Sequence, residues 1–314
     1  MIDFVEARRR LEAKDRSMRD KRATLPEAAA LIRDGDLVAA GGCLYSRTPM
    51  ALLREVLKRR PSGVTLARNL MCFEAELYVV AGCTSEMVTS WMGIGLPWGI
   101  SPILRRYVES GRLRFQEWSH LAFGLRLRAA ATGVPFLPTL SMLGSDLMRT
   151  SGAKTMTCPY TGRTLCLVPA LFPDVALIHV HRADRFGNGQ IDGYRHMDAD
   201  MAAAGTTVIM SAERIVEPDE IRSRRGETDI PFFAVDAVVE APLGAHPNEC
   251  YGLYDADMTH LGGYAEAVRR DGEDAVRAYL DRYVFGPAGL EEYLRSAGGG
   301  RLDGLRARAA DLVR

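Results

Sequence analysis

The sequence predicts an open α/β protein, in which a mainly parallel, twisted sheet is covered by helices on both faces and followed by a helical C-terminal tail. Three observations lead to this prediction. Several short apolar runs are continuous instead of alternating, which is typical of strands buried on both faces. Helical patterns lie between these runs, as the crossovers of a parallel sheet require. The chain has 314 residues, 47% of them hydrophobic, which is enough for one large core.

The N-terminal segment consists of a charged part and the start of the folded domain. Residues 4–22 carry many charges of both signs, so we expect a solvated helical arm, with an arm that grips a partner as the alternative. Thr24 and Glu27 match a capping box with proline in the first turn, and Gly35 stops the helix that follows. We therefore divide the chain into an arm (1–23), a main domain (24–257) and a helical extension packed on that domain (258–314).

A β-turn-α unit opens the main domain. Residues 37–40 form a short apolar run that ends in Gly41-Gly42, and Thr48-Pro49 opens a helix with apolar residues at helical spacing. We expect further strands over 63–66, 77–80, 87–91, 112–115, 134–137, 165–168, 175–180, 206–210 and 232–239. We expect helices over 101–109, 117–132 and 198–204 and, in the tail, over 273–284, 290–296 and 302–313.

Composition and missing motifs exclude several classes of function. The 40 basic residues balance the 40 acidic ones, so we expect neither nucleic acid nor an anionic membrane as a partner. No run approaches the roughly 18 apolar residues of a membrane span. The six cysteines form no Cys-x-x-Cys pair, which predicts reduced thiols in the cytoplasm and no metal site. The glycines of segment 93–99 suggest a dinucleotide loop, but Pro97 removes a needed amide, so we expect a plain loop.

The glycine turn is the best candidate for a site. Glycines at the carboxyl end of a strand let backbone amides approach a ligand, and open α/β sheets bind ligands at that edge. Arg47, in the same loop, could present a bidentate donor to a carboxylate or phosphate, or be an exposed structural arginine. His120, on the first turn of its helix, has a catalytic or substrate role as one reading and a structural role as the other.

These residues fall into an ordered series of motifs. Asp34-Gly35, Gly41-Gly42 and Pro49 resemble the first signature of the α subunit of family I CoA-transferases. The match continues through segments 134–138, 143–145, 181–188 and 229–231, and segment 235–255 resembles the glutaconate CoA-transferase branch of the family. Cys43 replaces the usual phenylalanine, and Arg47 stands at a glycine of the signature, as is typical of that branch. His120 stands where related ring-opening CoA hydrolases carry a catalytic carboxylate.

The resemblance implies a CoA-transferase fold of the NagB-RpiA-like type and a reaction. Members of this family move CoA between an acyl-CoA and a carboxylic or dicarboxylic acid by ping-pong chemistry on a glutamate in a Ser-Glu-Asn-Gly motif. That motif is absent from this sequence, which implies that the partner is a β subunit that supplies the glutamate. Coenzyme A then enters as the acyl-CoA substrate, together with a small organic acid, and no metal is needed.

The same resemblance suggests which residues bind the substrate, with the glycine turn supplying backbone donors. These residues are Gly41, Gly42, Cys43, Ser46, Arg47, Asn69, His120, Gly144 and Ser145, and only His120 has a possible catalytic role. Two other functions remain open. One is a CoA-ester hydrolase or a ring-opening or C–C cleaving enzyme on the same scaffold. The other is a binding or scaffolding chain without activity of its own.

Overall fold

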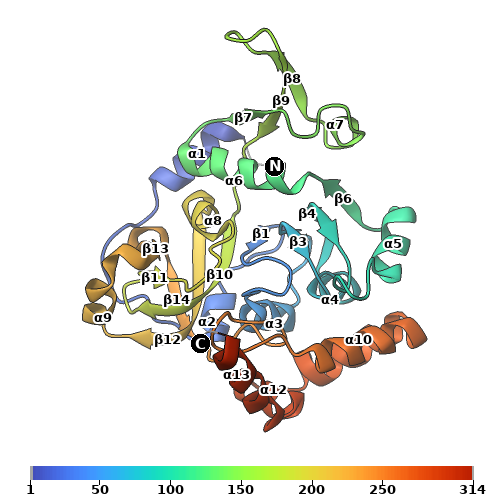
Figure 1. Cartoon of the computed structure of the whole chain (residues 1–314), viewed down its shortest axis with the longest axis vertical. Helices are drawn as coiled ribbons and strands as arrows, with labels where there is room; N and C mark the ends of the chain where they lie inside the picture. The colour runs from blue at the N-terminus through green and yellow to red at the C-terminus, as the bar shows by residue number, and fades with distance from the viewer. Residues whose placement is uncertain (1–2, 313–314) are drawn as a thin grey trace.

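A nine-stranded sheet forms the centre of the computed structural model, which describes residues 3–312 and, in the last helix, side chains as far as Arg306. Seven strands lie parallel in the order β14-β12-β10-β1-β2-β4-β6, and β11 and β13 extend β10 antiparallel (Figure 1). The strands are β1 (Leu37–Ala40), β2 (Val64–Ala67), β4 (Thr84–Thr89), β6 (Arg114–Glu117), β10 (Val175–Asp184), β11 (Gly189–Gln190), β12 (Thr207–Val216), β13 (Thr228–Ile230) and β14 (Ala237–Glu240). The predicted fold class is confirmed.

Helices bury both faces of this sheet. In β1, Val38 and Ala40 point into one apolar core, while Leu37 and Ala39 point into another. Because successive side chains of a strand face opposite ways, both sets of residues must be apolar, and the strand reads as a continuous run. The first core is covered by α2 (Leu25–Ala29), α3 (Met50–Arg59), α4 (Glu74–Val80), α5 (Pro102–Glu109), α10 (Met258–Asp271) and α11 (Glu273–Leu280). The second is covered by α1 (Phe4–Glu12), α6 (His120–Thr132) and α8 (Asp198–Ala204).

Smaller elements complete the chain. A three-stranded antiparallel sheet, β7 (Phe136–Thr139), β9 (Thr164–Pro169) and β8 (Lys154–Thr157), projects from the top of the molecule in Figure 1. The other short elements are β3 (Leu70–Met71), β5 (Trp91–Met92), α7 (Leu147–Thr150), α9 (Pro218–Ser223), η1 (Arg225–Glu227) and η2 (Phe232–Ala234). The tail continues through the π-helix η3 (Asp281–Phe285), α12 (Leu290–Ala297) and α13 (Arg301–Leu312). No helix within residues 3–312 is long and apolar enough to cross a membrane.

Three local predictions are wrong. The run 77–80 is helical and belongs to α4, where Leu77, Tyr78 and Val79 are all buried, so its apolar run is continuous without being a strand. The run 232–239 begins with the turn η2 and is a strand only from Ala237. The arm 4–22 is helical only over Phe4–Glu12, and it is not simply solvated, because Lys14 is buried against Asp236 with an N–O distance of 2.8 Å.

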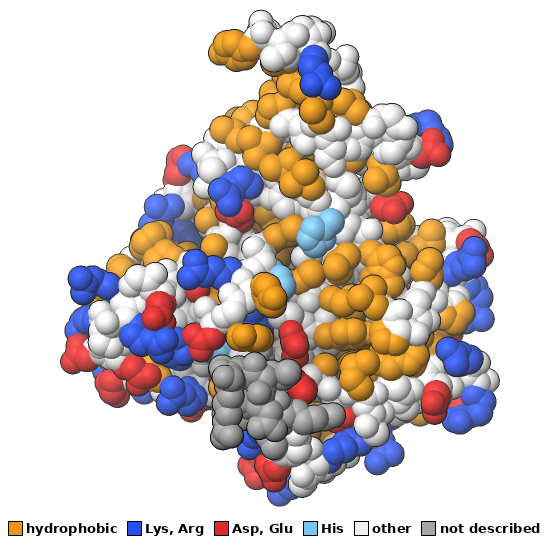
Figure 2. Space-filling model, in the orientation of Figure 1, with side chains coloured by type: hydrophobic (Ala, Val, Ile, Leu, Met, Phe, Trp, Pro, Cys, Tyr) orange, Lys and Arg blue, Asp and Glu red, His pale blue; other side chains and the backbone are white. Residues whose placement is uncertain are grey.

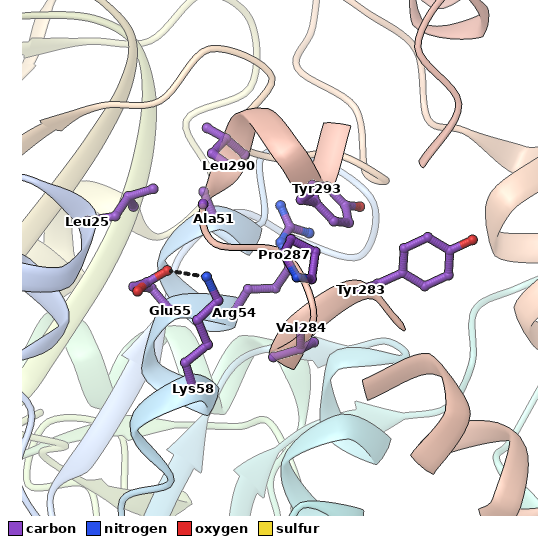
Figure 3. A pocket seen from close by; sticks show the side chains of 11 residues that line it. Leu25, Ala51, Arg54, Glu55, Lys58, Tyr283, Val284, Pro287, Leu290 and Tyr293 are labelled. Atoms are coloured by element: carbon purple, nitrogen blue, oxygen red, sulfur yellow. Dashed lines mark ion pairs between the residues drawn. The ribbon is translucent and has the colours of Figure 1, made fainter. Parts of the chain in front are cut away.

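The C-terminal helices pack on α3 through an arginine. The guanidinium of Arg54 lies 3.5 Å from the centre of the Tyr293 ring, and its Nη1 donates to the carbonyl of His246 at 2.9 Å. Figure 3 shows Leu290 and Tyr293 of α12 facing Ala51 and Arg54 across a narrow crevice. The buried half of α12 therefore rests on the same helix whose N-terminus follows the glycine turn.

Candidate functional site

The carboxyl ends of neighbouring parallel strands gather most of the predicted site residues. Gly41 to Cys43 follow β1, and Asn69 follows β2, which pairs with β1. The side chain of Asn69 forms a hydrogen bond with the thiol of Cys43. The Ser46–Arg47 segment folds back on the turn, because the amide of Cys43 donates to the carbonyl of Ser46 at 2.9 Å. Six of the nine predicted residues therefore lie together.

The turn needs glycine at both positions. Gly42 has φ +67°, and a Cβ there would lie 2.1 Å from the carbonyl oxygen of Ser46. A Cβ on Gly41 would lie 2.8 Å from the Oδ1 atom of Asp198. The turn amides already have acceptors within the chain: Gly41 donates to Leu177 and Gly42 to Asp198 Oδ1, each at 2.8 Å. The turn is thus held in one shape, and its amides take part in holding it.

The expectation that Arg47 is exposed is wrong. Its side chain is fully buried and donates from Nη1 to Asp198 Oδ2 at 2.7 Å, and Asp198 is fully buried too. The same guanidinium donates to the carbonyls of His179 and Tyr194 at 2.8 and 2.6 Å. Arg47 therefore ties the loop to β10 and to the start of α8. Asp198, which also holds the Gly42 amide, was not predicted, since nothing in the sequence separates it from other helix-start aspartates.

A second buried arginine lies under the same loop. Arg68, at the end of β2, pairs with Glu74 at 2.6 Å and is fully buried. Its other nitrogens donate to the carbonyls of Gly41 and Leu44, at 3.2 and 3.1 Å, and to the hydroxyl of Thr48 at 2.7 Å. A charged residue directly after an apolar strand is the signal that could have found it. Two ion pairs thus fix the loop from below.

The loop also pairs with a segment near the C-terminal end of the main domain. The amide of Glu249 donates to the carbonyl of Tyr45 at 2.7 Å, and the amide of Arg47 donates to the carbonyl of Glu249 at 2.9 Å. The hydroxyl of Ser46 donates to the Glu249 carboxylate. Partial burial raises the pKa of this carboxyl group, and the Ser46 hydrogen bond opposes the rise. Sequence reasoning missed this half-buried glutamate.

His120 lies on the other side of the candidate site. It is exposed and opens α6, whose N-cap is Ser119. Strand β6 is three strands from β1, which corresponds to about 14 Å. The packing of α6 on α8 narrows this gap, because a Cβ on Gly124 would lie 2.9 Å from the Met197 side chain.

His196, just before α8, connects the two sides of the site. It is exposed, and desolvation lowers its pKa to about 4, with Arg47, Arg68 and His120 also disfavouring its protonation. Tyr194 lies 6.1 Å from the His196 ring and 6.2 Å from the Tyr251 ring, between ring centres. Figure 2 shows histidine side chains in the middle of this face, with apolar side chains around them.

Gly144 and Ser145 lie apart from the turn. They belong to the loop between β7 and α7, where the Ser145 hydroxyl donates to the carbonyl of Met142 at 2.7 Å. This loop approaches His120 through a hydrogen bond of 2.7 Å between the hydroxyls of Ser119 and Ser141. Within residues 3–312, no hydrogen bond joins Gly144 or Ser145 to the glycine turn.

A buried cluster beside the site forms a closed hydrogen-bond network. The ligand atoms of His179, Glu213 and Cys250 lie within 4.8 Å of one another. The Glu213 carboxylate accepts from His179 Nε2 at 2.8 Å, from the hydroxyl of Tyr254 at 2.5 Å and from two backbone amides. Burial raises the pKa of the Cys250 thiol well above its usual value. Since the carboxylate oxygens already have donors, the cluster holds β10, β12 and the 243–254 loop together.

Apolar side chains are exposed next to the candidate site. Leu121 follows His120, while Leu96 and Ile100 lie in the loop 93–100 between β5 and α5. They are 57%, 69% and 64% exposed, respectively. Figure 2 shows a broad apolar area over the region of β3, α4 and α10. Such an area next to a polar site is typical of an interface with another protein.

Comparison with known proteins gives a consistent family. The family model described as coenzyme A transferase matches residues 22–241. A subunit of the glutaconate CoA-transferase of Acidaminococcus fermentans is 32% identical over 90% of this chain and 93% of its own length. An uncharacterized protein of Archaeoglobus fulgidus is 39% identical over 93% of this chain, which spans 66% of that protein. The cholesterol ring-cleaving hydrolase IpdA subunit of Rhodococcus jostii is 30% identical over 81% of this chain and 88% of its own length.

Solved structures agree with this. The crystal structure of glutaconate coenzyme A-transferase from Acidaminococcus fermentans superposes with a TM-score of 0.85 at 31% identity, over 91% of this chain and 95% of that one. The crystal structure of a variant of the decarboxylase AibA/AibB superposes with a TM-score of 0.72 at 32% identity, over 83% of this chain and 98% of that one.

Proposed function

The chain belongs to the coenzyme A transferase family, and from this premise we propose that it is the α subunit of a heteromeric CoA-transferase. The enzyme moves CoA between an acyl-CoA and a small carboxylic or dicarboxylic acid. One observation carries the proposal: the chain is similar along nearly its whole length to one subunit of a glutaconate CoA-transferase, while its sequence contains no Ser-Glu-Asn-Gly motif. A partner must therefore bring the nucleophile. All six cysteines are free, which supports a reducing, cytoplasmic location.

The partner's glutamate starts the reaction. Its carboxylate oxygen attacks the carbonyl carbon of the acyl-CoA, the C–S bond breaks, and a mixed anhydride and CoA thiolate result. The thiolate then attacks the glutamyl carbonyl, so that the acyl group leaves as a carboxylate and CoA remains as a glutamyl thioester. A second acid reverses these two steps and leaves as the new acyl-CoA. Each attack places negative charge on a carbonyl oxygen, which hydrogen-bond donors stabilise.

This chain shapes the acyl side of the site. Because the amides of Gly41, Gly42 and Cys43 already have acceptors, we assign the turn a shaping role and look for donors among side chains. Asn69 lies beside the turn and His120 faces solvent across from it. We propose that Asn69 and His120 orient the acyl group. The exposed apolar side chains around Leu96, Ile100 and Leu121 are the surface that the β subunit covers.

The test is to isolate the chain with its native partner. Native mass spectrometry of the complex should show a stoichiometric second protein, and its sequence should contain Ser-Glu-Asn-Gly. The complex should exchange CoA between an acyl-CoA and at least one acid of a broad panel, and replacing the motif glutamate by alanine should abolish this exchange. A complex that contains that glutamate but exchanges CoA with no acid would contradict the proposal.

A second function has one observation in its favour. The chain is also similar to a decarboxylase and to a subunit of a cholesterol ring-cleaving hydrolase, so the scaffold serves CoA-ester hydrolysis and C–C cleavage as well. It is less favoured, because His120 stands where the hydrolases carry a carboxylate. A partner of the same fold without the glutamate, together with product release in the absence of an acceptor acid, would favour this second function.

A further inference from the structure

We propose that the half of the acyl site built by this chain accepts an uncharged acyl chain and disfavours a second carboxylate, and that Glu249 sets this preference. This inference rests on the proposed function and narrows it from carboxylic acids in general to monocarboxylic acids. It follows from which charged groups surround the glycine turn and which of them are free to meet a substrate.

Neither arginine below the turn is available to a substrate carboxylate. Arg47 is fully buried, with Asp198 and two carbonyls as partners. Arg68 is fully buried, with Glu74, two carbonyls and a hydroxyl as partners. Withdrawing either guanidinium would leave a buried carboxylate without its counter-charge, which costs several kcal/mol. Both positive charges are therefore balanced inside the protein.

Glu249 is the carboxylate that faces the site. Its backbone pairs on both sides with the loop, through Tyr45 and Arg47, so its position relative to the glycine turn is fixed. Its carboxylate accepts from Ser46, whose carbonyl receives the Cys43 amide. It is half-buried, and no ion pair is formed by it within the part of the chain that the structure describes. A second carboxylate brought beside it would meet like charge in a partly desolvated place.

The other side chains around the turn are neutral or apolar. Burial raises the pKa of the Cys43 thiol, so it stays protonated at neutral pH. The pKa of His196 is lowered to about 4, so its ring is uncharged there. Asn69, Tyr194 and Tyr251 add polar but uncharged surface. A chain of CH₂ groups or an aromatic acyl group fits these surroundings better than a terminal carboxylate.

The experiment compares acids of equal length on the native complex. CoA exchange is measured with pentanoate against glutarate and with hexanoate against adipate, and the affinity of each acid is measured by calorimetry on the same complex. We expect kcat/KM to favour the monocarboxylate by at least tenfold. Glu249→Gln, which keeps the shape of the side chain, should raise kcat/KM for glutarate about tenfold, corresponding to about 1.4 kcal/mol, and leave pentanoate within about twofold. Glu217→Gln, an exposed glutamate before α9, is the matched control and should change neither.

The outcomes separate this inference from the proposed function. A native complex that prefers glutarate, or a Glu249→Gln variant with an unchanged ratio, would overturn the inference while leaving CoA transfer intact. Loss of exchange with both acids in a folded Glu249→Gln variant would overturn it too, since Glu249 would then be catalytic. If no acid supports exchange but calorimetry still shows the monocarboxylate preference and its reversal in the variant, the proposed function fails and the inference stands.

Discussion

Arg47 shows how a charged residue in a glycine-rich loop can serve the fold before it serves a ligand. Its guanidinium and the Asp198 carboxylate are both fully buried at 2.7 Å. Removing one partner of a buried pair leaves the other charge uncompensated, which costs about 3–5 kcal/mol. We therefore expect Arg47→Ala to lower the free energy of unfolding by that amount, measured by chemical denaturation, with loss of activity following loss of the loop.

The control for this variant is an arginine in an exposed pair. Arg105 is 71% exposed and contacts Glu109 at 3.0 Å on the surface of α5. Exposed pairs of this kind contribute about 0.5 kcal/mol or less, so Arg105→Ala should be close to neutral. An Arg47→Ala variant as stable as Arg105→Ala, with a raised KM for the acid, would restore a substrate-binding role for Arg47.

His120 gives the opposite prediction, because it is exposed and opens a helix that Ser119 caps. If its ring orients the acyl group through one hydrogen bond, His120→Ala should lower kcat/KM for CoA exchange about fivefold, corresponding to about 1 kcal/mol. The melting temperature should not change. Leu121→Ala, the next residue along α6, is the matched control. An unaltered rate in His120→Ala under saturating and subsaturating acid would assign this histidine a structural role.

At the scale of the element, the turn after β1 and the loop after β7 offer two glycines with similar backbone angles. Gly42 has φ +67° and Gly144 has φ +77°, but only at Gly42 would a Cβ meet another atom, the carbonyl oxygen of Ser46 at 2.1 Å. Gly144→Ala should cost about 1 kcal/mol of backbone strain. Gly42→Ala should cost clearly more, since the 43–47 segment must move as well. Thermal unfolding of the two variants, and CoA exchange by each complex, would test this difference. Equal destabilisation would show that crowding at Gly42 is relieved without cost.

The sequence was informative about the elements wherever local chemistry determined them. The capping box at Thr24 and Glu27 is present as predicted, because both of its hydrogen bonds lie within four residues. The strands β1 and β10 were predictable because burial on both faces leaves continuous apolar runs. The helix α4 was mistaken for a strand for the same reason: it is covered on almost every side, and its periodicity disappears.

The candidate site was only partly predictable. The glycine turn, Cys43 and Asn69 come together because parallel strands end at one edge. The partners of Arg47 could not be found, because Asp198 and His179 lie more than 130 residues away along the chain and nothing local marks them. Glu249 was missed because its position depends on long-range backbone pairing with the 45–47 segment.

At the scale of the whole molecule, the tail is part of the core. Leu261, Val276 and Val284 belong to the same apolar cluster as residues of β1, β2 and α3. Arg301, at the start of α13, pairs with the buried Asp257 at 3.0 Å, and Asp257 contacts His246 Nε2 at 3.2 Å. The limits of the three predicted segments of the chain remain predictions. Removal of residues 258–314 would expose this cluster, so we expect the truncated chain to be insoluble or unfolded, as judged by solubility and circular dichroism.

Buried histidines make the stability of the whole molecule depend on pH. His181 Nδ1 accepts the amide of Asp192 at 3.1 Å, so Nε2 carries the proton that it donates to the carbonyl of Tyr251 at 2.8 Å. Desolvation lowers the pKa of His181 from 6.5 to about 4, and that of His260 from 6.5 to about 3. Below pH 6.5 the unfolded chain therefore binds protons that the folded chain does not, and stability is lost as the pH falls towards these values.

Each of these histidines should cost about 2 kcal/mol of folding free energy between pH 7.5 and pH 5. Measuring urea unfolding across that window keeps the experiment above the range in which most carboxylates titrate. His181→Gln and His260→Gln should be less stable than the native sequence at pH 7.5, because each loses a buried hydrogen bond. Their unfolding free energies should nevertheless fall less steeply as the pH drops, since one titrating group has been removed. A slope unchanged by either substitution would mean that the two rings take up protons while the protein is folded, and that their burial does not keep them neutral.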